Sequence, residues 1–129
     1  MAIGELYKSA DWKSEKHVPV IDCPDSAAAG EAVTVKLCVG KEISHPNTTA
    51  HHIRWIKLYF KPEGGTVYEA AALDFAAHAE SGKGADEGPA LAEPFGCVTL
   101  KLKTSGTLIA TSYCNIHGLW ESAKDIKVG

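Results

Sequence analysis

Long apolar runs and clusters of basic residues are both missing from this 129-residue chain. No apolar run approaches the roughly 20 residues that a membrane-spanning helix needs, so we expect no membrane span. The chain has no Lys/Arg cluster to neutralise phosphates, and its formal net charge of −3 also argues against nucleic-acid binding. The residues that follow Met1 lack the apolar segment and small-residue cleavage site of a secretory signal, and none is expected.

Cysteine is sparse and its spacing shows no pairing. The chain has four cysteines, with no Cys-x-x-Cys pair and none of the dense spacing of a disulfide-stapled domain. This pattern favours a reducing compartment, and we expect a cytoplasmic protein. Hydrophobic residues make up 45% of the chain and charged residues 22%, which indicates one globular domain over residues 1–129. A chain of this length buries about two-thirds of its unfolded surface in one core.

Short runs of alternating hydrophobicity indicate an all-β protein. In residues 32–39, for example, four apolar side chains share one face, as in a half-buried strand. Residues 67–77 are ambiguous, because their alanines favour a helix whereas their position between two turns suits a strand. About seven strands at this spacing predict an Ig-like antiparallel β-sandwich. We expect an N-terminal arm at 1–16, a long loop at 81–94, and strands at 18–21, 32–39, 52–61, 67–77, 97–103, 107–113 and 124–128.

A cysteine and a histidine lie three residues apart near the end of the chain. Cys114 and His117, closed by Gly118, offer a thiolate and an imidazole from one turn, and this pair suits iron, copper or zinc. Taken alone, a small buried Cys beside a loop His is an equally good interpretation of the same pair. Histidines elsewhere in the chain favour the metal.

Counting strand directions brings three of these histidines to the same place. If each expected strand runs antiparallel to the one before it, then His17, His45 and His51 lie at the end of the sandwich that also holds Cys114 and His117. Two histidines six residues apart can meet at one ion only if their segment loops, and the Pro-Asn that follows His45 is typical of a turn. We therefore predict a metal site of four imidazoles and one thiolate.

Zinc and copper remain alternatives at this site. Structural zinc normally has four ligands, so five candidates fit it poorly. A blue-copper site also uses a Cys-x-x-His near the end of a β-sandwich, but usually with a weak axial Met after the second His. The one methionine here is Met1, although a Gln or a backbone oxygen can replace an axial Met. His52 and His78 share no spacing with another ligand and are interpreted as ordinary loop or surface histidines.

Three segments resemble the motifs of superoxide reductases, and more narrowly those of the short one-iron neelaredoxins. They are Glu15-Lys16-His17-Val18-Pro19, His45-Pro46-Asn47-Thr48-Thr49-Ala50-His51-His52-Ile53 and Tyr113-Cys114-Asn115-Ile116-His117-Gly118-Leu119-Trp120. The resemblance extends over essentially the whole chain. Two-iron desulfoferrodoxins add a rubredoxin-like domain that is absent here, which implies a single iron. Ala50 departs from the pattern, since an acidic residue is expected before the ligand histidine.

The resemblance implies a role for each residue of the site. One mononuclear iron would be held by four equatorial imidazoles and one axial thiolate, namely those of His17, His45, His51, His117 and Cys114. Glu15 would close the sixth position in the ferric form, and Lys16 would be the catalytic lysine. Superoxide would take one electron from the iron and two protons from solvent, and leave as hydrogen peroxide.

The resemblance also implies partners. A rubredoxin-like protein would return the electron after each cycle, and the one-iron members suggest a homotetramer. Positive charge at the ferrous site and at Lys16 would attract superoxide. The alternative function is that of a non-catalytic, cupredoxin-like electron-transfer protein.

Overall fold

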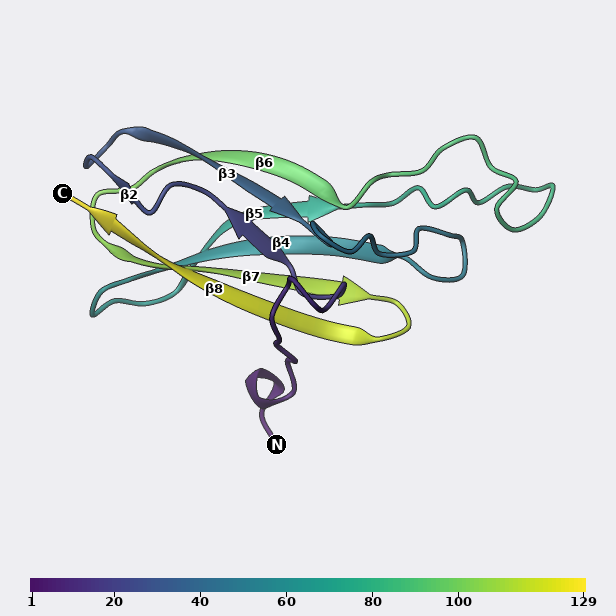
Figure 1. The fold of residues 1–129 in the computed structure, drawn as a ribbon, viewed down its shortest axis with the longest axis horizontal. Helices are drawn as coiled ribbons and strands as arrows, with labels where there is room; N and C mark the ends of the chain where they lie inside the picture. Colours follow the sequence, from purple (N-terminus) through teal and green to yellow (C-terminus); the bar gives the residue numbers. More distant parts are fainter.

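The computed structural model covers residues 1–129 and shows two β-sheets packed face to face (Figure 1). The smaller sheet has the strand order β1-β3-β6, and the larger sheet has the order β2-β8-β7-β4-β5. The strands are β1 (Val20–Asp22), β2 (Ser26–Ala27), β3 (Ala32–Cys38), β4 (Ile53–Pro62), β5 (Tyr68–Asp74), β6 (Phe95–Lys101), β7 (Gly106–Cys114) and β8 (Gly118–Val128). The predicted all-β sandwich is thereby confirmed, and every strand pair is antiparallel except β2 with β8.

Three details of the predicted strands need correction. The structure has eight strands rather than about seven, because the two-residue β2 was not expected. The ambiguous segment 67–77 contains strand β5, since pairing with β4 outweighs the helical preference of its alanines. Strand β8 begins at Gly118 rather than at 124, because a tight turn folds it directly back onto β7, with Cys114 opposite Gly118. Gly118 has a φ of 85°, a left-handed conformation that glycine adopts without strain.

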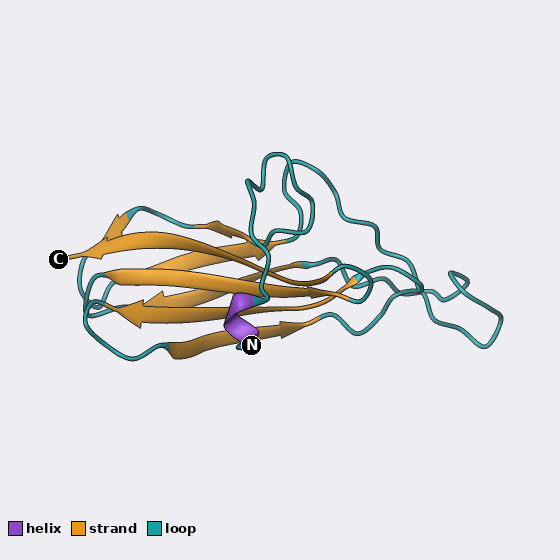
Figure 2. Cartoon of the chain, turned by 90° about the horizontal axis from the view of Figure 1, so that it is seen from below, coloured by secondary structure: helices purple, strands orange, loops and turns teal.

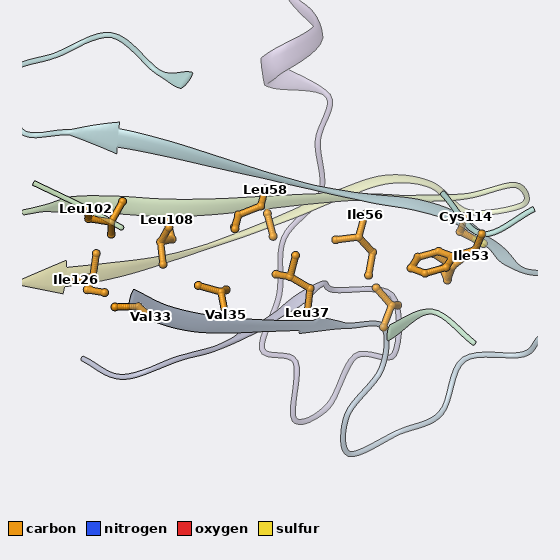
Figure 3. Packing of buried hydrophobic residues seen from close by; sticks show 13 residues of the cluster. Val33, Val35, Leu37, Ile53, Ile56, Leu58, Leu102, Leu108, Cys114 and Ile126 are labelled. Carbon is orange, nitrogen blue, oxygen red and sulfur yellow. The ribbon is translucent and has the colours of Figure 1, made fainter. Parts of the chain in front are cut away.

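The core lies between the two sheets and runs along the full length of the sandwich (Figure 3). Strand β3 shows the alternation of apolar and polar residues that forms this core. Its Val33, Val35 and Leu37 are buried, whereas Thr34 and Lys36 between them are exposed. Opposite them, the larger sheet contributes side chains from β4, β7 and β8, namely Ile53, Ile56, Leu58, Leu108, Ala110, Cys114 and Ile126. Each large aliphatic side chain buried in this way stabilises the fold by about 1.5–3 kcal/mol.

The N-terminal arm leaves the sandwich, as Figure 1 shows, and carries a single turn of 3-10 helix, η1 (Ile3–Glu5), coloured purple in Figure 2. The arm is fastened to β8 at one point. The Lys8 N–H donates to the Leu119 carbonyl oxygen (3.1 Å), and the Glu121 N–H donates to the Lys8 carbonyl oxygen (2.8 Å). No helix in the structure is long and apolar enough to cross a membrane.

Three loops project from the same end of the sandwich, on the right in Figure 1. They are residues 39–52 between β3 and β4, residues 75–94 between β5 and β6, and residues 115–117 between β7 and β8. The smaller sheet's edge strand β1 begins at this same end, because Val20 pairs with Cys38 at the end of β3. The fold thus delivers all the segments that carry the candidate ligands to one end.

Candidate metal centre

The structure brings the five predicted ligand residues together at the end of the sandwich. His17 lies just before β1, and His45 and His51 lie in the loop between β3 and β4. Cys114 is the last residue of β7, and His117 lies in the turn that follows. The arrangement arises from strand direction, since each of these segments enters or leaves a strand at the same end.

The side-chain nitrogens and the sulfur converge on a small volume. The Nδ1 atom of His117 lies 3.0 Å from Nε2 of His17, 3.2 Å from Nε2 of His51 and 3.8 Å from Sγ of Cys114. The potential ligand atoms of His17, His45, His51 and Cys114 all lie within 4.8 Å of one another. Nitrogen ligands stand about 2.1 Å from an ion such as zinc, so neighbours at right angles are about 3 Å apart. The nitrogen–nitrogen spacings of 3.0 and 3.2 Å therefore match those of neighbouring ligands around one ion.

The four imidazoles are arranged as a square. Neighbouring ring centroids are 4.9 Å apart for His17 and His45, 4.7 Å for His45 and His51, 5.0 Å for His51 and His117, and 4.5 Å for His117 and His17. The diagonal from His17 to His51 is longer, at 6.4 Å. Four imidazoles and one thiolate around one point exceed the four ligands of a tetrahedral structural zinc site.

In two of the four rings, those of His17 and His45, a hydrogen bond fixes which nitrogen faces the site. The Nδ1–H of His17 donates to the Glu15 carboxylate (2.6 Å), and the Nδ1–H of His45 donates to the Pro46 carbonyl oxygen (2.7 Å). The Nε2 atom of each ring therefore carries a lone pair toward the cluster. Nε2 of His45 is buried and has no hydrogen-bond partner in the protein. Buried lone pairs that face one another are unfavourable unless a cation lies among them, so these residues fit a metal ion.

The sulfur is the deepest of the donor atoms. Cys114 is fully buried in the hydrophobic core, whereas the His117 side chain is exposed and His51 is half-buried. The backbone N–H of His117 donates to the Cys114 sulfur (3.3 Å). A hydrogen bond of this kind favours the thiolate and lowers the electron density on the sulfur. The site therefore has an apolar floor on the sulfur side and opens to solvent past His117.

Glu15 and Lys16 lie beside the cluster rather than within it. The Glu15 carboxylate contacts Nδ1 of His17, on the side of the ring away from the other imidazoles. This hydrogen bond lowers the pKa of Glu15, so the carboxylate stays ionised. Lys16 is half-buried, with its backbone next to His17. The predicted roles of both residues stay predictions, since the carboxylate here orients a ligand ring instead of pointing at the cluster.

Burial and nearby positive charge make the imidazoles of His45 and His51 poor bases. Burial lowers the pKa of His45 to about 4, and burial together with the His117 and His17 rings lowers the pKa of His51. Neutral imidazole is the form that binds metals. The folded chain therefore keeps both side chains ready for an ion at neutral pH.

This shift predicts a pH-dependent stability for the metal-free protein. The folded pKa of His45 lies below the ordinary 6.5, so the unfolded state binds more protons as the pH falls from about 6.5 to about 4. The free energy of unfolding should drop over this range by at most about 3 kcal/mol from His45. Urea denaturation of the metal-free protein at several pH values measures the drop. A His45→Gln variant should flatten the profile, and an equally steep profile in that variant would assign the effect elsewhere.

Two side chains that the sequence did not single out, Trp120 and Asn115, brace the ligands. The Trp120 indole stacks on the His17 ring, with centroids 5.2 Å apart and an interplanar angle of 15°, and its Nε1–H donates to the His117 carbonyl oxygen (3.3 Å). Asn115 joins the two ligand turns: its Nδ2 donates to the Ala50 carbonyl oxygen (2.9 Å), and its Oδ1 accepts the His52 N–H (2.9 Å). In the sequence, the only feature that pointed to either residue is its position within the segment that carries Cys114 and His117.

The departure at Ala50 has no visible effect on the loop. Its side chain is exposed, and only its carbonyl oxygen makes a contact, with Asn115. An acidic residue at this position would point to solvent. His52 and His78, by contrast, were interpreted as ordinary loop or surface histidines, and the surface interpretation is wrong: both are buried, at 4% and 2% exposure.

Comparisons with known proteins agree on one family. The sequence pattern described as desulfoferrodoxin matches residues 9–123. A neelaredoxin of Megalodesulfovibrio gigas is 52% identical over 127 residues, which cover 98% of each chain. A superoxide reductase of Pyrococcus furiosus is 54% identical over 121 residues, covering 93% of this chain and 95% of the relative. The solved structure of a superoxide reductase (neelaredoxin) from Archaeoglobus fulgidus in the reduced form is 48% identical, with a TM-score of 0.87, covering 95% of this chain and 98% of the other.

Proposed function

The chain belongs to the desulfoferrodoxin family, and from that membership and its metal centre we propose that it is a superoxide reductase. The observation that carries the proposal is the cluster of four imidazoles and one thiolate, with a buried, unpartnered nitrogen on His45. The reaction adds one electron and two protons to superoxide and yields hydrogen peroxide. The cupredoxin-like alternative has no support in the comparisons or in the square array of imidazoles.

We propose iron as the metal, one ion in each chain. Nε2 of His17, His45 and His51, Nδ1 of His117 and the Cys114 sulfur would hold it. When bound, iron supplies the one-electron chemistry by cycling between Fe²⁺ and Fe³⁺. A thiolate among nitrogen ligands is electron-rich and favours electron donation. We also propose that residues 1–129 form a single iron-binding domain, since one core connects both sheets.

The chain's own residues would orient the ligands and guide the substrate. The Glu15 carboxylate and the Pro46 carbonyl hold the rings of His17 and His45 with Nε2 toward the site. The side of the metal site that holds Cys114 faces the core. Superoxide would therefore approach from the solvent side, near the exposed His117. The Lys16 ammonium would attract the anion and order water molecules that deliver protons. Glu15 would be a further ligand for the oxidised ion, and its carboxylate would then have to release the His17 ring that it contacts here.

Electrons must come from outside the chain. We propose a rubredoxin-like protein as the donor and a homotetramer as the assembly, as the family resemblance implies. The exposed Ile116, between the two ligand residues of the last turn, is a short path from the surface to the site. We propose a cytoplasmic location, which all four cysteines support because they are free thiols in the structure.

Metal analysis and a superoxide assay test the function together. The purified protein should contain close to one iron atom per chain, and the reduced protein should consume superoxide and form hydrogen peroxide in equal amounts without releasing oxygen. Copper in place of iron, without any reaction with superoxide, would favour the electron-transfer alternative. Zinc at four ligands would point to a structural site.

Glu15→Ala is expected to affect the oxidised protein selectively. If Glu15 closes the sixth position, its loss should leave the iron content and the rate of the superoxide reaction nearly unchanged. The ferric spectrum should change, and external anions such as cyanide should bind more readily. Glu15→Gln is the matched control for the hydrogen bond to His17, since its amide oxygen can still accept from Nδ1. An unchanged ferric spectrum in Glu15→Ala would limit the carboxylate to orienting His17.

A further inference from the structure

The two histidines outside the metal cluster form a buried pair. The rings of His52 and His78 are stacked, with centroids 3.5 Å apart and an interplanar angle of 5°. His52 donates from Nδ1 to the Thr48 carbonyl oxygen (2.9 Å), and its Nε2 accepts from the Arg54 Nε–H (3.4 Å). His52 is therefore satisfied as a neutral ring. None of these atoms faces the metal cluster.

His78 differs from its neighbour because both of its nitrogens face acceptors. Nε2 lies 2.6 Å from the Phe75 carbonyl oxygen, and Nδ1 lies 2.8 Å from Oδ1 of Asn47. The Asn47 amide cannot be turned round without loss, because its Nδ2 donates to the Ala92 carbonyl oxygen (3.0 Å). An imidazole meets two oxygen acceptors at these distances only when both nitrogens carry hydrogen. The geometry thus indicates a His78 that donates from both sides.

Burial opposes this doubly protonated form. Burial, and after it the charges of His52 and Arg54, lower the pKa of His78, while the hydrogen bond to Phe75 and the Glu80 carboxylate act in the opposite direction. The charged groups around the ring are Glu80, which accepts the His78 backbone N–H (2.7 Å), and Arg54, which lies beyond the neutral His52 ring. A lone pair facing a carbonyl oxygen at 2.6 Å would be repulsive. Charge-assisted hydrogen bonds are stronger than those between neutral groups, and two of them offset the loss of hydration of the buried ring.

Through Asn47, His78 reaches the loop that carries two of the ligands. Asn47 lies two residues after His45, and Thr49 lies two residues before His51. The Thr49 hydroxyl donates to the His78 carbonyl oxygen (2.7 Å). The Thr49 N–H also donates to the Asp86 carboxylate (2.8 Å), and the Asp86 N–H donates to the Thr49 hydroxyl oxygen (3.1 Å). The ligand loop is thus bound to residues 78–92 by the hydrogen bonds of Asn47 and Thr49, which lie between its two ligands.

We propose that His78 is a positioning residue of the metal centre, donating from both ring nitrogens so that Asn47 holds the His45–His51 loop in the ligating conformation. This role rests on the proposed metal centre, although His78 would touch neither the ion nor the substrate. It explains why His78, which shares no ligand spacing with another residue, is buried to 2% exposure. The long loop between β5 and β6 then serves as the outer support of the site.

Nitrogen NMR of the full-length, zinc-loaded protein tests the protonation without any substitution. Zinc is diamagnetic, so the ring signals remain visible. His78 should show two protonated ring nitrogens near neutral pH, whereas His52 should show one protonated and one unprotonated nitrogen. An unprotonated nitrogen in His78 would overturn the double donation.

Release of cobalt(II) to a chelator tests the positioning role. His78→Gln and Asn47→Ala should each speed cobalt release by about 10–100-fold, the usual effect of losing an outer partner of a metal ligand. The double variant should release cobalt no faster than Asn47→Ala, since residues acting through one contact are not additive. Val33→Ala, at the opposite end of the core in Figure 3, is the control that lowers the melting temperature without faster release.

The outcomes separate this inference from the proposed function. Wild-type protein that binds no cobalt would overturn the metal centre and the positioning role together. Wild-type protein that binds cobalt tightly, with His78→Gln and Asn47→Ala releasing it at the wild-type rate, would overturn the positioning role alone. Additive effects in the double variant would show that His78 does not act through Asn47.

Discussion

A Cys114→Ser variant is expected to lose the visible sulfur-to-iron charge-transfer band of the ferric protein. Cys114 is fully buried, and its sulfur lies 3.8 Å from Nδ1 of His117, so no other thiol can take its place at the cluster. A serine hydroxyl is a much weaker acid than a thiol and stays protonated at neutral pH, so the site would lose its thiolate ligand. Iron affinity and the rate with superoxide should both fall by more than the 10–100-fold that is usual for outer partners.

The other cysteines provide matched controls for this substitution. Cys97 is exposed on β6, and Cys97→Ser removes one thiol from the chain without touching the cluster. Its ferric spectrum and iron content should equal those of the wild type. A Cys114→Ser protein that binds iron and keeps the band would exclude Cys114 as the thiolate ligand.

The position of the site was predictable because local sequence patterns are enough to identify the strands. The direction of each strand then determines which loops lie at the same end of the sandwich. Alternating residues in 32–39 and the run of large side chains after His52 identified β3 and β4, and strands of opposite direction put their loops at one end. Which residues converge therefore followed from counting strands. Counting strands could not predict which atoms converge, because the nitrogen of His17 or His45 that faces the site depends on a hydrogen bond to Glu15 or Pro46.

Elements stabilised by tertiary contacts escaped prediction. The first half of β8 has no alternation of its own, and it is a strand because β7 pairs with it residue by residue from Cys114 onward. His78 follows a run of alanines in which nothing suggests burial, and its place is set by the stacked ring of His52 and by Asn47, 31 residues earlier in the chain. Side chains that support a site from another loop leave no periodic signal in the sequence.

Lys16→Ala is expected to slow the reaction with superoxide without changing the metal site. Lys16 adjoins His17 in the sequence. The pKa of His51 is lowered mainly by burial and by the His117 and His17 rings, and the positive charge of Lys16 lowers it further. The electric field of Lys16 therefore reaches the cluster. A protonated amine cannot ligate a metal, which leaves an electrostatic role. Fields focused on an anion site raise on-rates by about 10–10³-fold, and one lysine should supply about tenfold of this. Iron content and the ferrous spectrum should equal those of the wild type.

Ionic strength and the position of the charge make this prediction specific. Screening extends over about 10 Å at 0.1 M salt, so the difference between wild type and Lys16→Ala should shrink as salt is added. Lys16→Arg keeps the charge and should retain most of the rate.

Lys101→Ala removes the same charge at the far end of β6, opposite Ala32, and should leave the rate nearly unchanged because it is distant from the cluster. Stopped-flow or pulse-radiolysis rates measure all four proteins. Equal rates for wild type and Lys16→Ala at low salt would remove the steering role, and an equal loss in Lys101→Ala would assign the effect to net charge alone.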